Sequence, residues 1–158
     1  MNRIPHSWMI SNLKKSHLIL GALIKDISQE QAQQLRDGSD GWNILEIICH
    51  VRDYQEIFYG RLKRILNEDN PTFEVYDEVA REAMITERDY ANQNLKAVFA
   101  DYCQTRDDLV RFLSELEEEQ WQRVGIHPML GEVDITVPIF HTILHDADHS
   151  EQIARICN

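Results

Sequence analysis

The sequence predicts an all-α fold, a single four-helix bundle with one long crossover connection, in which residues 1–158 form one domain. Apolar residues recur at steps of three and four along four long segments, and this spacing is typical of helices that bury one face. A bundle is the arrangement that lets four such faces meet in one core. Because Ile135 and Val137 are too few alternating residues to make a sheet, no sheet is expected.

The first helix is expected to end near Ile27. Its apolar stripe consists of Ile10, Leu13, His17, Leu20, Ile24 and Ile27. The segment Ser28-Gln29-Glu30-Gln31 has the pattern of a capping box and predicts a short helical turn. Asp37-Gly38-Ser39-Asp40-Gly41 then breaks the chain, directly before Trp42.

The second helix is expected from about Asn43 to Leu66, and His50 lies beside its apolar stripe. Its stripe consists of Ile44, Ile48, Val51, Phe58, Leu62 and Ile65. Asn67-Glu68-Asp69-Asn70-Pro71 ends this helix, and the stretch to about Tyr76 has no clear period. We therefore expect a long connection here, which permits a crossover rather than a tight hairpin.

Helical character resumes near Asp77 and continues to Glu117-Glu118-Glu119, as one long helix or as a broken one. Pro128 and two glycines between Gly125 and Glu132 predict an irregular loop. The last helix is expected to open near Thr136, with Pro138 in its first turn.

Composition excludes several classes of partner. The chain has 27 acidic and 16 basic residues, a net charge of -11, and no Lys/Arg cluster, so nucleic acid is not expected as a partner. The longest apolar run, Leu18 to Ile24, is far short of the ~20 residues that a membrane span needs. No small-residue cleavage site follows that run, so neither a signal peptide nor a membrane anchor is expected.

The cysteines indicate a reducing compartment. Cys49, Cys103 and Cys157 are widely spaced and form no CxxC pair, which predicts reduced thiols and a cytoplasmic protein. A nucleophilic cysteine needs a base and an orienting group, and nothing local to Cys103 or Cys157 supplies them. We therefore interpret the cysteines as small buried apolar residues.

Two histidines four residues apart are the main candidates for chemistry. In His145-Asp146-Ala147-Asp148-His149 both imidazoles project from one face of a helix and can coordinate one metal ion. His50, on the second helix, is a third candidate that arrives from across the bundle. Three neutral imidazoles suit Zn²⁺, Ni²⁺, Fe²⁺ or Mn²⁺ and leave a coordination position open for water or a small-molecule substrate. Such an ion lowers the pKa of a bound water or thiol.

The periodicity of the last helix leaves two interpretations open. If Ile143, Ala147 and Ala154 face the core, the histidines, including His141 one turn before the pair, lie in water. If the helix is embedded all round, with Phe140, Leu144 and Ile153 widening its apolar side, the histidines line an internal cleft.

The acids near the histidines and the remaining histidines have simpler interpretations. Asp53, Asp146 and Asp148 are candidates to orient the ligands, or else solvated helix charges. We expect His127 to be a turn residue, and His6 and His17 to be ordinary surface or helix-edge residues. The sequence assigns no catalytic residue.

Two segments of the chain resemble the DinB/YfiT-like family. One is Trp42-Asn43-Ile44-Leu45-Glu46-Ile47-Ile48-Cys49-His50-Val51-Arg52-Asp53. The other runs from Gly125-Ile126-His127-Pro128 to the His145–Arg155 segment and is similar to the family's HPxxG and HDxxHxxQIxR patterns. The resemblance implies a four-helix bundle with a divalent metal at one end, held here by His50, His145 and His149, and a homodimer. His141 matches no ligand position and is expected to line the site or to be structural.

The resemblance implies a function less specifically than it implies the metal ligands. The wider superfamily includes thiol-dependent S-transferases and a mycothiol-dependent isomerase, so the leading expectation is a metal-dependent enzyme that acts with a low-molecular-weight thiol. A non-catalytic metal-binding or dimerisation bundle linked to stress response is an alternative, and a metal-assisted hydrolase is a third. The substrate is left open, because the residues that line the pocket come from several helices whose rotation the sequence does not fix. The native metal is left open too, because three imidazoles accept several ions.

Overall fold

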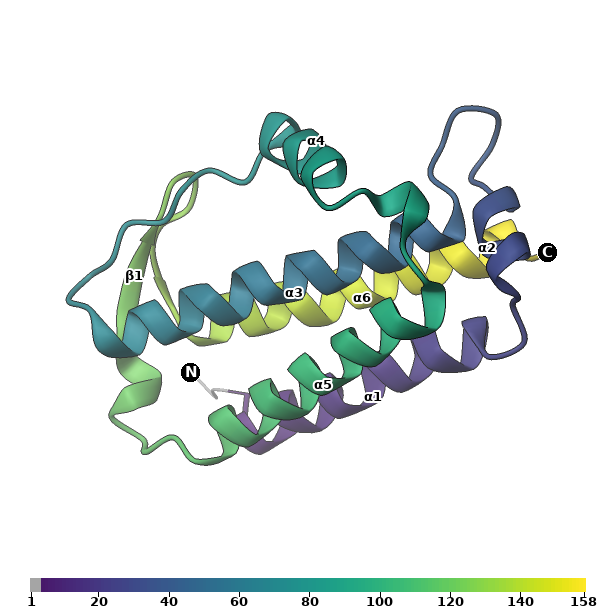
Figure 1. Ribbon diagram of the computed structural model, residues 1–158. Coiled ribbons are helices and arrows are strands. Elements are labelled where there is room, and N and C mark those ends of the chain that lie inside the picture. The colour runs from purple at the N-terminus through teal and green to yellow at the C-terminus, as the bar shows by residue number, and fades with distance from the viewer. Residues whose placement is uncertain (1–3) are drawn as a thin grey trace.

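Four long helices build the molecule, as seen in a computed structural model that describes residues 4–158 (Figure 1). The bundle helices are α1 (His6–Ile24), α3 (Ile44–Asn67), α5 (Leu95–Ser114) and α6 (Thr136–Ile156). Between them lie α2 (Gln29–Gln34), α4 (Glu78–Glu87), the 3-10 turns Tyr90–Asn92 and Gln120–Gln122, and the strands β1 (Val124–His127) and β2 (Gly131–Asp134). No helix within residues 4–158 is long and apolar enough to cross a membrane.

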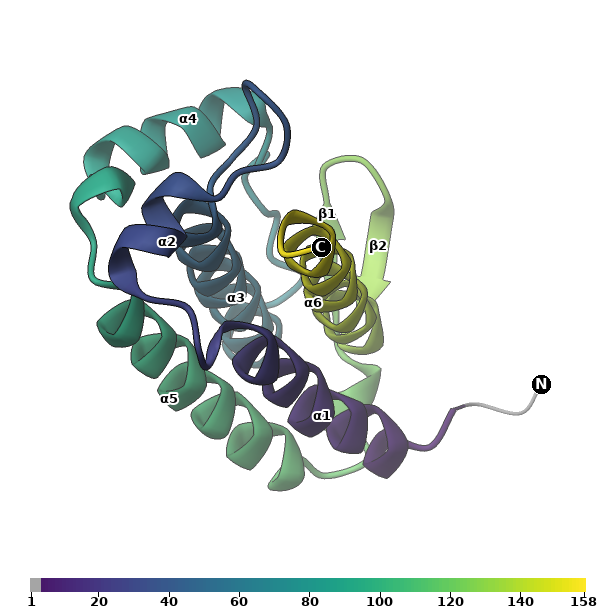
Figure 2. The ribbon, with the colours of Figure 1, turned by 90° about the vertical axis from the view of Figure 1, so that its right-hand side faces the viewer.

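The helices follow an uncommon order around the bundle. Viewed from one end, α1 packs between α5 and α6, and α3 packs between the same two helices on the opposite side (Figure 2). The helices α1 and α6 run in one direction and α3 and α5 in the other (Figure 1). Each helix therefore has one parallel and one antiparallel neighbour. The crossover segment, residues 68–94, returns the chain from the end of α3 to the opposite end of the bundle, which confirms the predicted architecture.

Capping side chains set the helix starts that the sequence indicated. Ser28 Oγ accepts a hydrogen bond from the Gln31 N–H at 3.1 Å, and Gln31 Oε1 accepts one from the Ser28 N–H at 2.9 Å. The same reciprocal pair joins Asn43 and Glu46 at the start of α3. Such pairs satisfy backbone N–H groups that the first helical turn leaves without partners. The predicted third helix is broken, because Asp89, with φ +47°, interrupts it between α4 and α5.

The expected loop between Gly125 and Glu132 is a β-hairpin, so the prediction that the chain has no sheet is wrong. Strands β1 and β2 pair antiparallel from Val124 opposite Asp134 to His127 opposite Gly131. Backbone bonds to the crossover segment hold β1 on its other side: the Ile126 N–H donates to the Pro71 carbonyl at 2.8 Å and the Phe73 N–H donates to the Ile126 carbonyl at 3.0 Å. The hairpin thus has a second backbone partner that is distant in the sequence, which a local pattern does not reveal.

A polar layer divides the core of the bundle into two apolar clusters. The cluster at the α2 end includes Leu20, Ile24, Ile44, Leu45, Ile48, Val98, Tyr90 and Ile153. The cluster at the hairpin end includes Met9, Leu13, Leu62, Ile65, Phe73, Leu109, Trp121 and Ile139. Between them the guanidinium of Arg106 is buried and hydrogen-bonded to Ser16, Gln55 and Asp146 from the other three bundle helices. Paired in this way, the buried charge is tolerated in the core.

Candidate metal centre

Three histidine rings from two helices meet between α3 and α6. His50 Nε2 lies 2.9 Å from His145 Nε2, and His149 Nε2 lies 3.2 Å from His145 Nε2. One nitrogen from each of the three rings lies within 4.8 Å of the other two. The helices therefore bring together the three residues that the sequence singled out, and they point the same ring nitrogen of each toward one place.

The spacing and the chemistry of these nitrogens fit a divalent ion. Ligand nitrogens about 2.0–2.1 Å from a tetrahedral metal lie about 3.3 Å from one another, close to the two distances from His145 Nε2 of 2.9 and 3.2 Å. Burial, followed by the neighbouring imidazoles, lowers the pKa of His50 to about 3 and the pKa of His145 to about 2. Burial also lowers the pKa of His149. The rings are thus neutral at pH 7, which is the form that coordinates a metal.

Gln152 fixes the orientation of one of these rings. Its Oε1 lies 2.8 Å from His149 Nδ1. Because an amide oxygen only accepts hydrogen bonds, Nδ1 carries the proton and Nε2 presents its lone pair to the cluster. The Gln152 amide nitrogen in turn donates to Asp37 Oδ2 at 3.0 Å, and Asp37 also accepts from Arg155. The sequence places Gln152 on the histidine face, but nothing in it indicates Asp37, which is 115 residues away.

The three acids that the sequence offered as orienting groups do not take that role. Asp53 is buried and accepts hydrogen bonds from Arg52, Arg88 and Tyr90, so it ties the crossover segment to α3. Asp146 faces the interior of the bundle. Asp148 is exposed to solvent. Each is one to three residues from a ligand, and neighbouring helical residues point about 100° apart.

The rotation of α6 matches neither interpretation of its periodicity in full. Leu144 is 59% exposed and Ala147 is exposed, whereas Thr142, Asp146 and Ser150 face the core. The interpretation that put the histidines in water and Ala147 in the core is wrong, because the core-facing side of α6 is polar at these positions. The histidine pair turns toward α3, as in the second interpretation, but the helix is not embedded all round, because Leu144 and Ala147 are exposed.

Aromatic rings enclose the histidines. The Trp42 ring centre lies 4.8 Å from that of His50, and the guanidinium of Arg81, from α4, lies over Trp42 at 5.4 Å. Tyr54 stacks on His145 with 3.7 Å between ring centres, and its hydroxyl lies 3.1 Å from His141 Nδ1. His141 thus borders the cluster without joining it. The helix α4 lies on the side of α3 away from α1 and α5 (Figure 1).

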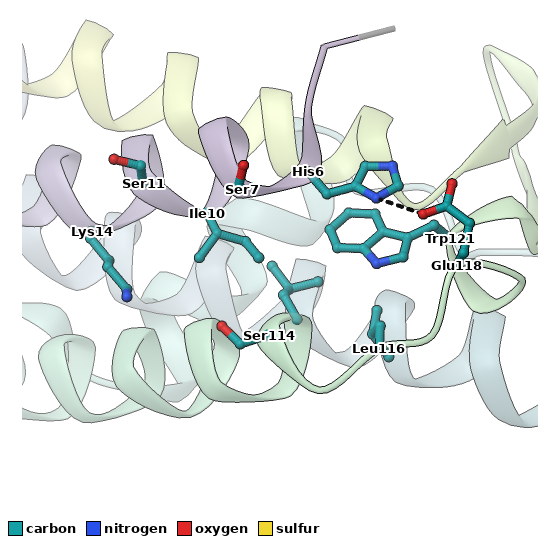
Figure 3. Close-up of a pocket in the computed structure, with 10 residues that line it drawn as sticks. His6, Ser7, Ile10, Ser11, Lys14, Ser114, Leu116, Glu118 and Trp121 are labelled. Carbon is teal, nitrogen blue, oxygen red and sulfur yellow. Dashed lines mark ion pairs between the residues drawn. The ribbon is translucent and has the colours of Figure 1, made fainter.

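The other histidines lie elsewhere. His127 is the last residue of β1 rather than the predicted turn residue, and its ring accepts hydrogen bonds from the backbone N–H groups of Met129 and Leu130 in the turn that follows. The His6 ring stacks on Trp121 at 3.9 Å beside a cavity of about 490 Å³ between α1 and the end of α5 (Figure 3). His6 Nδ1 also lies 3.6 Å from the Glu118 carboxylate, so this residue is more than the plain helix-edge histidine that was expected. That cavity contains no cluster of metal-ligating side chains from the described part of the chain.

Comparisons with known proteins place these features in a family. The family model described as the DinB superfamily matches residues 14–153. A Bacillus cereus protein, provisionally named a metal-dependent hydrolase, is 30% identical over 134 residues, which cover 84% of this chain and 74% of the relative. An Oceanobacillus iheyensis protein with the same provisional name is 24% identical over 149 residues, or 94% of this chain and 82% of the relative.

Two solved structures share the fold. YfiT of Bacillus subtilis, described provisionally as a metal-dependent hydrolase with an unusual four-helix bundle topology, matches with a TM-score of 0.84 at 20% identity and covers 99% of this chain and 89% of its own. A mycothiol-dependent maleylpyruvate isomerase matches with a TM-score of 0.78 at 12% identity, over 95% of this chain and 61% of its own. At identities of 20% and 12%, the similarity to these two structures shows a shared fold alone.

Proposed function

The chain belongs to the DinB superfamily, and from that premise we propose that it is a metal-dependent enzyme in which His50, His145 and His149 hold a divalent ion and a low-molecular-weight thiol is the nucleophile. The observation that carries the proposal is the convergence of three neutral, buried imidazoles on one place. Three ligands leave at least one coordination position for a reactant. An ion bound there supplies positive charge that lowers the pKa of a thiol or water beside it.

The surroundings of the histidines favour a thiol over water. Asp53 and Asp146 are occupied by arginines, and Asp37 contacts Gln152 and Arg155 rather than a histidine. Within residues 4–158, the metal-ligating cluster contains histidines and no carboxylate. A thiol that coordinates a metal is deprotonated outright, whereas a metal-bound water keeps a pKa of about 7 and gains from a neighbouring base. The mycothiol-dependent isomerase of the same fold agrees with this choice.

A metal-assisted hydrolase is the second candidate. The names of the Bacillus cereus and Oceanobacillus iheyensis relatives favour it. It requires the same three ligands but predicts product formation from an ester or amide with no thiol added.

Metal binding is tested first. Wild-type protein titrated with Zn²⁺ and Ni²⁺ is expected to bind about one ion per chain, and His50→Ala, His145→Ala and His149→Ala are expected to lose it while circular dichroism stays helical. His17→Ala is the matched control, because His17 lies on α1 and is absent from the cluster. If the wild type binds less than a tenth of an equivalent of any ion, the proposal fails.

Turnover is tested second. Metal-loaded protein is mixed with a chromogenic electrophile and a panel of thiols, and separately with a chromogenic ester and no thiol. A rate that needs both metal and thiol supports the transferase, and a metal-dependent rate without thiol supports the hydrolase. Metal binding with no metal-dependent rate in either assay would mean a non-catalytic bundle.

A further inference from the structure

A pocket of about 200 Å³ adjoins the histidine cluster on the side toward the β-hairpin. Its walls include Tyr54, Phe58, Arg61, Tyr76, His127 and His141, from α3, the crossover segment, the hairpin and α6. Tyr54 belongs to both places, because its ring also stacks on His145. The pocket and the proposed metal site are therefore separated by one aromatic ring.

Within residues 4–158, Arg61 is the only charged residue that lines this pocket, and no carboxylate forms an ion pair with it. The residue is 8% exposed, and its one hydrogen bond is from an η nitrogen to the Glu74 carbonyl at 2.8 Å. No carboxylate within residues 4–158 lies within ion-pairing distance of it. Its guanidinium lies over Phe58 at 5.2 Å, which does not neutralise the charge. Buried charges in proteins are normally paired, and the missing counterion of Arg61 is therefore an exception that a bound anion would explain.

The next arginine along the helix shows the contrast. Arg64 is partly exposed and pairs with Glu68 at 3.0 Å and with Glu74 at 3.3 Å. The carboxylate of Glu74 is thus used by Arg64, while Arg61 receives only the Glu74 backbone carbonyl.

The other polar groups of the pocket are able to donate hydrogen bonds. The Tyr76 hydroxyl is buried and has no partner within the described residues. His127 accepts backbone N–H groups at Nδ1, which leaves Nε2 as the ring's donor. Although the chain has 27 acidic residues, no Asp or Glu lines this pocket. A positive pocket rich in donors within an acidic protein is complementary to an anion.

We propose that this pocket binds the carboxylate group of a small-molecule ligand, with Arg61 as its counterion. The planar fork of a guanidinium matches a carboxylate through two parallel hydrogen bonds. Phe58 and Tyr54 offer apolar walls for the adjoining carbons. Pockets for whole drug-sized ligands measure roughly 300–1,000 Å³, so a space of about 200 Å³ suits one end of a ligand.

This inference deepens the proposed function and rests on it in one respect, that the ligand is a substrate of the metal centre. The Cα atoms of His50 and Arg61 are separated by about three turns of α3, or roughly 16 Å along the helix axis. The substrate is then an elongated molecule whose carboxylate lies at the end away from the reacting atom.

The probes are 3-phenylpropionate, its neutral amide 3-phenylpropanamide, and inorganic phosphate, each titrated into the full chain by calorimetry. The acid is expected to bind at least tenfold more tightly than the amide. Arg61→Gln should remove that preference, and Arg64→Gln, the matched control one turn away, should keep it. Equal binding of acid and amide, or an unchanged preference in Arg61→Gln, would overturn the proposal. Binding of phosphate in place of the acid would overturn the carboxylate assignment.

Two further measurements keep the test decisive. Arg61→Lys retains the charge and loses the fork, so a folded Lys variant should bind the acid severalfold more weakly, which still tests the pocket if the Gln variant does not fold. In NMR titrations, the acid should shift the ring signals of His127 and His141 and leave those of His6 unchanged. Shifts confined to His6 would place the ligand in the other cavity and refute the assignment.

The His149→Ala variant separates failure of this inference from failure of the proposed function. His149 contacts Gln152 and His145 and does not line the pocket. The variant should lose the metal and still bind the acid. If the wild type binds the acid but no metal, the carboxylate pocket is supported and the enzyme proposal is refuted. If it binds metal but not the acid, the metal site is supported and the carboxylate pocket is refuted.

Discussion

Asp146 and Arg106 form an ion pair in the middle of the bundle, with 2.8 Å between Asp146 Oδ2 and an Arg106 η nitrogen and with both side chains removed from solvent. All five N–H groups of the guanidinium have acceptors, which are Gln55, the Leu13 carbonyl, Ser16, Tyr102 and Asp146. The Tyr102 hydroxyl donates to the other oxygen of Asp146 at 2.8 Å. Since Asp146 directly follows His145, this pair fixes the rotation of α6 that turns the histidines toward α3.

Breaking that pair is expected to destabilise the fold strongly. Asp146→Asn leaves a buried guanidinium without its counterion, and such a loss costs about 3–5 kcal/mol in the free energy of unfolding. Urea unfolding of the metal-free protein measures it. Asp108→Asn, which removes the exposed partner of Arg111 on α5, is the control and should change the free energy by about 0.5 kcal/mol or less. Equal effects of the two substitutions would contradict the assigned role.

Gln152 is expected to act through His149. Gln152→Leu removes the acceptor that holds the proton on Nδ1, and the loss of such a partner typically weakens metal affinity by about 10- to 100-fold. Competition with a chromophoric chelator measures the affinity. Glu151→Gln, a change at the preceding exposed residue, should leave it within twofold. A Gln152→Leu variant with wild-type affinity would show that the ring is oriented by packing alone.

The metal-free protein should lose stability in mild acid. In the folded chain the pKa of His50 is lowered to about 3 and that of His145 to about 2. Between pH 6.5 and these values, both histidines are therefore protonated in the unfolded chain and neutral in the folded chain. Stability is therefore complete above pH 6.5 and falls below it, by about 2 kcal/mol per histidine at pH 5. Urea unfolding at pH 7.5 and pH 5.0 tests this. A His50→Asn/His145→Asn double variant should have a flatter dependence, and His17→Asn should not.

The hairpin should tolerate no side chain at Gly125. A Cβ atom there would lie 2.6 Å from the Phe73 ring and 3.0 Å from Ile65, so Gly125→Ala must displace a buried ring, at a cost of about 1–3 kcal/mol. Gly60, inside α3, has no atom within 4 Å of such a Cβ, and Gly60→Ala should stabilise the helix by about 0.5–1 kcal/mol. Melting temperatures that move in opposite directions would agree with both assignments, and a neutral Gly125→Ala would contradict the first.

How much the sequence predicts depends on whether the partner is local. The capping boxes at Ser28 and Asn43 lie within four residues of the groups that they bond, and both helix starts were predicted to within a residue. The strands β1 and β2 are four residues each and carry Pro128 and two glycines in or beside them, so their sequence reads as a loop although they pair locally. Asp146 faces the core because Arg106, 40 residues away, neutralises its charge. The spacing of apolar residues along α6 cannot predict that ion pair.

The same distinction applies to the candidate site. The spacing of the pair predicted His145 and His149, and His50 was a candidate from its place on the second helix before the family motif supported it. Gln152 was placed on the correct face but given no role. Arg61 carries no signal in the sequence, because an arginine near the end of a helix is usually a solvated charge, and only the packing of the crossover segment and the hairpin around it leaves it buried.

None of the ten residues of α4 is fully buried, and its Ile85 packs against the core only in part, yet its Arg81 lies over the tryptophan next to His50. The bundle supplies the ligands, and a segment outside the bundle covers them. Changes of length or side chain in α4 are therefore expected to alter what reaches the proposed metal site at less cost to folding than changes in α3 or α6.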